Sequence, residues 1–122
     1  MPDQTAILEA AERLGQLLAQ HPAVRRLEEL MQQLDNDVEA QRLQTDLARH
    51  RETLADKQRD GKPIEVDDKR RLESLQQSVA AHPILRDLQL AQMDYVDLMR
   101  SVDRKISSAR ADDTTASSTA GA

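Results

Sequence analysis

The chain contains no cysteine, no tryptophan and no phenylalanine, and it has a single tyrosine. The absence of cysteine excludes a disulfide framework, a thiolate zinc site, a cysteine-ligated iron–sulfur cluster and a cysteine nucleophile. Only three glycines and four prolines are present. An all-β sandwich needs aromatic and β-branched strands with frequent turns, so this composition disfavours it. Long helices are therefore the expected structure.

Long hydrophobic runs are also missing, since no window approaches the roughly 18 apolar residues of a membrane span. The first residues, MPDQTAILEAAERLGQ, lack the basic and apolar regions of a signal peptide, so a cytoplasmic location is expected. The 122 residues include 16 Leu, 4 Ile and 6 Val. That content lies just above the level typical of disorder and predicts one thin core in a single domain.

The net charge of −5 is unevenly distributed along the chain. Residues 1–41 carry 8 acidic groups against 3 basic ones, whereas residues 42–71 carry 7 against 9. A general polyanion binder needs a concentrated basic face. This mixture of charges therefore argues against direct binding of nucleic acid.

Apolar spacing predicts five helices, which makes the fold class all-α: an elongated bundle with a long antiparallel hairpin and a long C-terminal helix. His21-Pro22 and His82-Pro83 each end one helix and start the next, because proline suits the first helical position. Asn36, followed three residues later by Glu39, predicts a capping-box start, and Gly61 predicts a C-terminal stop. The expected helices cover about 4–20, 22–34, 36–61, 65–81 and 83–110.

Two of these helices are expected to form the antiparallel hairpin. Leucines recur at wide intervals in the third helix, and a turn near residue 63 pairs positions whose numbers add up to about 126. Leu54 with Leu72, and Leu47 with Val79, satisfy this sum. A stripe this narrow favours a helical hairpin or coiled coil.

The C-terminal helix carries a heptad seam that we predict to contact other chains. Its candidate interaction residues are Leu85, Leu88, Tyr95, Met99, Val102 and Ile106. Two long helices in so short a chain expose more apolar stripe than the other three can cover, which predicts a homodimer or larger assembly. Residues 108–122 are Ser-, Thr- and Ala-rich and offer nothing to bury, so we expect a domain over 1–107 and a disordered tail over 108–122.

Catalytic and metal-binding patterns are weak in this sequence. No H-E-x-x-H pair is formed by the three histidines, His21, His50 and His82. The only carboxylate one helical turn from any of them is Asp46, which precedes His50. A metal-dependent helical enzyme would need these histidines to meet. Capping and packing histidines are the better interpretation, so no catalytic residue, metal or cofactor is predicted.

The predicted hairpin tip combines cations with two apolar residues. Acidic residues lie among the cations, and no aromatic side chain is nearby to stack on a base. A salt-bridged tip is therefore favoured, with an RNA-binding or RNA-chaperone module as the alternative. Ile64 and Val66 would either staple the following helix or form a small docking tip, and the staple is favoured. The cations are Lys57, Arg59, Lys62, Lys69, Arg70 and Arg71.

The stretch from about Ile7 to Ile106 resembles the YlbF/YmcA family of small helical bacterial regulators. The segments that carry the resemblance are AAERLGQLL at 10–18, DNDVEAQRLQTDLARHRETL at 35–54, QRDGKPIE at 58–65, LESLQQSVAAHPILRDLQLAQ at 72–92 and LMRSVDRKI at 98–106.

The resemblance implies an all-α fold, self-association and a non-enzymatic role in hetero-complexes that modulate RNA processing by the endoribonuclease Y machinery. Family members associated with iron–sulfur clusters use cysteines, and this chain has none. We therefore expect an adaptor or regulatory subunit whose partners are itself and another protein, without a membrane or direct nucleic-acid contact.

Overall fold

The computed structural model describes the backbone of residues 3–120 and the side chains of residues 3–112. This part of the chain consists of five α-helices without a strand, which confirms the all-α expectation. The helices are α1 (Gln4–Gln20), α2 (Pro22–Asp35), α3 (Val38–Arg59), α4 (Val66–Ala81) and α5 (Pro83–Ala120).

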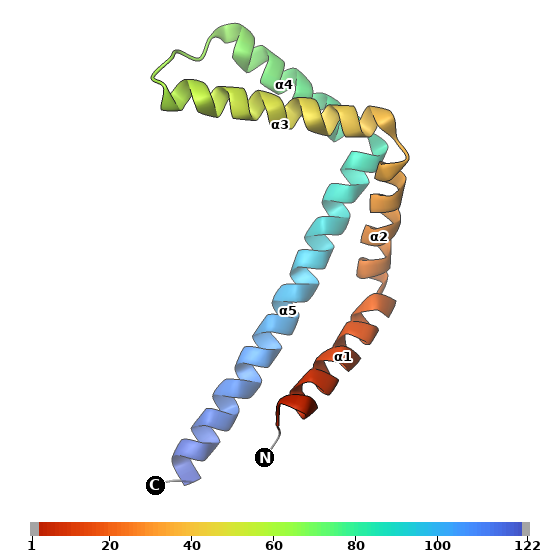
Figure 1. Ribbon diagram of the computed structural model, residues 1–122, viewed down its shortest axis with the longest axis vertical. Helices are drawn as coiled ribbons and strands as arrows, with labels where there is room; N and C mark the ends of the chain where they lie inside the picture. The colour runs from red at the N-terminus through yellow and green to blue at the C-terminus, as the bar shows by residue number, and fades with distance from the viewer. Residues whose placement is uncertain (1–2, 121–122) are drawn as a thin grey trace.

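The helices form two projecting parts that meet at an elbow (Figure 1). One part, which we call the arm, consists of α1, α2 and the long α5, with α1 and α2 in line along one side of α5. The other part is the antiparallel hairpin of α3 and α4. In the hairpin α3 packs against α4, and in the arm α2 packs against α5. The elongated shape and the hairpin are therefore as the sequence predicts.

Both His-Pro sequences lie at helix junctions. His21 ends α1, and its Nδ1 atom accepts a hydrogen bond from the backbone N–H of Ala23 at 3.0 Å, so it also caps α2. His82 ends α4 just before Pro83 begins α5. Proline therefore takes the first helical position at both junctions. The ring of His21 caps the following helix, whereas Nδ1 of His82 has no hydrogen-bond partner among the described residues.

The hairpin turn is defined by Gly61, which has a φ of 71°. The N–H of Gly61 donates to the carbonyl of Gln58, and the N–H of Lys62 donates to the carbonyl of Lys57 at 2.8 Å. These two bonds form a Schellman motif, which needs a left-handed residue at this position. A capping box of Glu65 and Asp68 then starts α4.

The core is small and lies where α2 packs against the first half of α5. Leu30 of α2 is buried against Leu88 and Ala91 of α5, with Leu27 and Leu34 packed around them. Three further leucines and one alanine are buried near the elbow and in the hairpin: Ala40, Leu47, Leu75 and Leu85. The thin core expected from the composition is thus the one observed.

Two expected helix boundaries are wrong. The N-cap of α3 is Asp37, which accepts a hydrogen bond from the N–H of Ala40 at 2.8 Å, whereas Asn36 donates back to the carbonyl of Gln32 in α2. The side chain of Asn36 is thus used to end α2 and cannot start α3.

The second boundary is the end of α5, which continues to Ala120 instead of ending near Arg110. No glycine or proline occurs between residues 84 and 120, so no residue type that breaks helices interrupts α5 there. The helix therefore runs through residues that the sequence assigns to a disordered tail, and residues 121–122 of that tail lie outside the described part. The division of the chain at residue 107 stays a prediction.

Candidate protein-interaction surface

The predicted seam of α5 is divided by the fold into an internal and an accessible part. Leu85 and Leu88 are each 4% exposed, because the elbow and α2 cover them. Further along the helix, Tyr95, Met99 and Val102 are half-buried, and Ile106 is 48% exposed. The contact of these residues with other chains stays a prediction, and the part of the seam open to another chain begins near Tyr95.

The first helix covers little of this accessible part. No residue of α1 is buried, and its apolar side chains Ile7, Leu8 and Leu17 are about 60% exposed. An amphipathic helix gains most of its stability by burying its apolar face. This helix therefore presents apolar surface that is suited to contact with another chain.

A second apolar face on α5 was not identified from the sequence. Leu90 and Met93 are each 57% exposed and Val96 is 43% exposed, on the side of the helix away from Leu88 and Ala91. Their spacing of three residues is a signal that could have revealed them. Polar neighbours obscured this spacing, because Gln89, Gln92, Asp97 and Arg100 line a shallow hollow of about 350 Å³ together with Met93 and Val96.

The accessible area of the chain is large for its mass. It amounts to 9702 Å², whereas a compact monomer of 13.7 kDa has about 6,600 Å². The excess of about 3,000 Å² exceeds the roughly 800 Å² that one partner buries in a standard interface. The molecule therefore has enough uncovered surface for at least one other chain.

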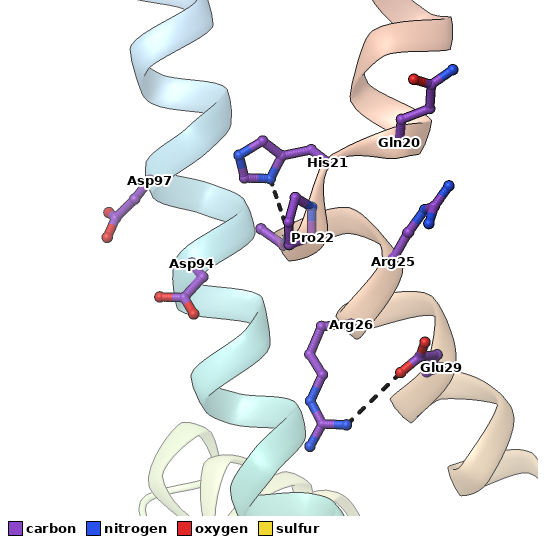
Figure 2. A pocket seen from close by; sticks show the side chains of 9 residues that line it. Gln20, His21, Pro22, Arg25, Arg26, Glu29, Asp94 and Asp97 are labelled. Carbon is purple, nitrogen blue, oxygen red and sulfur yellow. Dashed lines mark hydrogen bonds and ion pairs between the residues drawn. The ribbon is translucent and has the colours of Figure 1, made fainter.

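A hollow of about 750 Å³ lies between the α1–α2 junction and α5 (Figure 2). Arg26 of its lining pairs with Glu29 of the same helix at 3.9 Å, and outside the hollow it pairs with Asp87 of α5 at 3.5 Å. Asp94 and Asp97 point away from His21 in Figure 2. The hollow thus brings no acid and base together for catalysis.

The three histidines occupy separate places. His21 lines the same hollow as Asp94 and Asp97 but on its opposite side, whereas His82 precedes the start of α5, about 18 Å along the helix from Asp94. His50 contacts the backbone carbonyl of Asp68 across the hairpin at 2.8 Å. Within the described residues no group of three histidines or carboxylates could hold a metal ion.

The hairpin tip is an interleaved set of ion pairs. Lys57 and Asp68 join α3 to α4 at 2.6 Å, and Arg59 pairs with Asp56. The hydrogen bond from Lys57 lowers the pKa of Asp68, helped by the backbone N–H of Glu65, and the same side-chain bond raises the pKa of Lys57.

The two apolar residues of the tip differ in exposure. Ile64 is half-buried, whereas Val66 is 62% exposed. A hydrophobic staple by Ile64 would need an apolar partner at the fourth helical position of α4, and that residue is Lys69. Docking at this tip stays a prediction.

The geometry described so far is that of an open helical scaffold with uncovered apolar faces and no catalytic cluster in the described residues. A family model described as control of competence regulator ComK, YlbF/YmcA, matches residues 7–109. The chain belongs to the YlbF/YmcA family. The family resemblance of the sequence is thereby confirmed, and the family is described by regulation and not by catalysis.

A solved structure supports the same fold for this YlbF/YmcA-family chain. The chain is similar to the crystal structure of Bacillus subtilis RicA in complex with RicF, with a TM-score of 0.75 and 19% identity. The match covers 85% of this chain and 92% of the other. No curated protein matches the chain. None of the described helices is apolar enough over sufficient length to cross a membrane.

Proposed function

We propose that this YlbF/YmcA-family chain is a non-enzymatic regulatory subunit that acts by helix-to-helix contact with other proteins. The observation that carries the proposal is the excess accessible area of about 3,000 Å², which includes the apolar faces of α1 and α5. Faces of this kind on a soluble surface are typical of interaction sites. Other protein chains would cover them in the working assembly.

Two kinds of partner belong to this proposal. RicA, whose fold this chain shares, was solved in complex with RicF. By analogy, this chain joins another regulatory protein, and it also associates with further copies of itself. Through such a complex it modulates RNA processing in the bacterial cytoplasm, as the family resemblance implies.

Direct RNA binding by the tip cations is the alternative. Two of those cations, Lys57 and Arg59, are already paired with Asp68 and Asp56. Four exposed cations remain: Lys62, Lys69, Arg70 and Arg71. The chain has a single aromatic residue, Tyr95 of α5, and none at the tip. Stacking on aromatic side chains is what usually stabilises single strands on a protein. The adaptor is therefore favoured.

One experiment with paired variants tests the adaptor function. The tagged chain is purified from its native host in three forms: wild type, Val102→Asp on the seam of α5, and Arg104→Asp beside it. We expect a defined protein to co-purify with the wild type and Arg104→Asp but not with Val102→Asp, provided that circular dichroism shows both variants folded. Equal retention by all three would contradict a role for the seam.

The RNA alternative is tested on the same purified protein. We expect no measurable RNA binding near physiological salt in a gel shift. Micromolar binding that falls steeply with salt, and that disappears when Lys69, Arg70 and Arg71 are reversed to Glu, would favour the RNA module instead.

A further inference from the structure

A second heptad pattern runs along the side of α5 that faces away from α2. The positions 86, 89, 93, 96, 100 and 103 alternate steps of three and four residues, which places them on one stripe of the helix. They hold Arg, Gln, Met, Val, Arg and Asp, so the stripe is apolar at its centre and charged at its ends. We call these six residues the outer stripe.

Among the described residues, α1 and α2 lie along one side of α5, and no helix lies along its opposite side below the elbow (Figure 1). Met93 and Val96 at its centre are 57% and 43% exposed. Three shallow hollows follow one another along it and share residues. The first, under the hairpin, shares Gln89 and Gln92 with the second, and the second shares Asp97 and Arg100 with the third. The surface is thus continuous from the hairpin to Arg104.

The outer stripes of two copies are complementary when the two α5 helices are antiparallel but not when they are parallel. When a second α5 packs antiparallel about a point between residues 94 and 95, facing residues have numbers that add up to 189. Met93 then meets Val96, Gln89 meets Arg100 and Arg86 meets Asp103, so apolar residues pair at the centre and opposite charges at the ends. A parallel pair would place each Arg and each Asp against its own copy, which costs free energy.

The overall charge distribution also favours contact through α5. The helices α1 and α2 together carry 5 acids against 3 bases, so two copies of them would repel each other weakly. Residues 83–110 carry 4 acids and 5 bases. The excess area of the chain is larger than a standard dimer needs from each partner.

We infer that a second copy of this chain docks on the outer stripe, with the two α5 helices antiparallel and Met93 facing Val96 of the other copy. This inference rests on the proposed function, because it specifies which surface the self-association uses. It leaves α1 and the seam from Tyr95 to Ile106 accessible to a different protein.

Because the natural chain has no cysteine, single cysteines can report the pairing directly. Arg86→Cys and Asp103→Cys are made separately, both at exposed positions about 25 Å apart along one helix, too far for a bond within a chain. Each variant is oxidised alone and as an equal mixture. We expect a disulfide-linked dimer from the mixture and none from either variant alone.

The remaining outcomes separate the inference from the proposed function. Links within each variant alone would show a parallel pair, and a dimer by sedimentation without any link would place the contact elsewhere. Both outcomes overturn the inference and leave self-association intact. A monomer throughout overturns the inference together with self-association, whereas retention of a different protein in the native host would still support the adaptor function.

A second pair of variants checks the centre of the stripe. Met93→Asp is expected to abolish the dimer and to leave the circular dichroism of the chain unchanged, because Met93 is largely exposed within one chain. Met31→Asp is the matched control, since Met31 is 52% exposed on α2. Loss of the dimer in both variants, or in neither, contradicts a contact at Met93.

Discussion

Single residues decide where the helices of this chain start and stop, and most of them act through backbone hydrogen bonds. Gly61 supports the Schellman motif of the hairpin, Asp37 caps α3, and His21 caps α2. Each of these effects is local, so each can be tested by one substitution. The small core makes such contributions a substantial part of the total stability.

Replacing Gly15 or Gly61 by alanine is expected to change the free energy of unfolding in opposite directions. Gly61→Ala is expected to destabilise by about 1 kcal/mol, because its φ of 71° is unfavourable for a residue with a Cβ atom. Gly15→Ala lies inside α1 and is expected to stabilise by about 0.5–1 kcal/mol. A Cβ atom meets nothing within 4 Å at either position, so the backbone alone sets the sign. Urea unfolding checks both, and a stabilising Gly61→Ala would contradict the left-handed turn.

The Lys57–Asp68 pair predicts a pH dependence of stability. The pKa of Asp68 is lowered in the folded chain, so its contribution is present above the ordinary carboxyl pKa and is lost as pH falls through the folded value. The pKa of Lys57 is raised, so its contribution is present below the ordinary lysine value and is lost as pH rises through the folded one.

Melting curves against pH test this pair. Asp68→Asn is expected to melt lower than the wild type at neutral pH, and the two curves are expected to converge in acid. Asp67→Asn removes a charge from the same turn and serves as the control. A constant difference between Asp68→Asn and the wild type at every pH would contradict the pairing.

At the scale of whole elements, stability depends on how α2 packs against α5. This contact contains the core of Leu30, Leu88 and Ala91, while α1 buries no residue. The elements therefore differ in how much the fold depends on them. We expect α2 to be essential to folding and α1 to be available for partners.

Adjacent residues of α2 test this difference. Leu30 is 1% exposed and Met31 is 52% exposed. Leu30→Ala is expected to cost about 3 kcal/mol through lost burial and a cavity, whereas Met31→Ala is expected to change stability by less than about 0.5 kcal/mol. Denaturant titration measures both, and similar costs would show that the core lies elsewhere.

Deletion of residues 108–122 tests whether the end of α5 contributes to stability. The segment carries no large apolar side chain, so its deletion is expected to change the free energy of unfolding by less than about 0.5 kcal/mol even though the helix continues to Ala120. A melting temperature lowered by many degrees would mean that this end of α5 packs against the rest of the chain.

The helices could be predicted because their signals are local. The His-Pro junctions and the stop at Gly61 follow from neighbouring residues, and the hairpin follows from a single turn, while the pairing of its leucines stays a prediction. The interaction surface could not be predicted in the same way, because only the packing of α2 on α5 decides that Leu88 is internal. The outer stripe gives no apolar periodicity in the sequence, since four of its six positions are polar or charged.

For the whole molecule, shape and charge are the informative properties. An arm and a hairpin meet at an elbow and leave about 3,000 Å² more accessible area than a compact monomer has (Figure 1). The negative charge is concentrated in residues 1–41, while α5 is nearly balanced. We therefore interpret the chain as one component of an assembly, with α5 as its main contact element.

Sedimentation equilibrium of the purified chain at tens of micromolar tests this central claim most directly. Association through uncovered helix faces predicts a mass of at least twice 13.7 kDa, which decreases toward the monomer mass on dilution. A mass of 13.7 kDa at every concentration would contradict self-association through these faces.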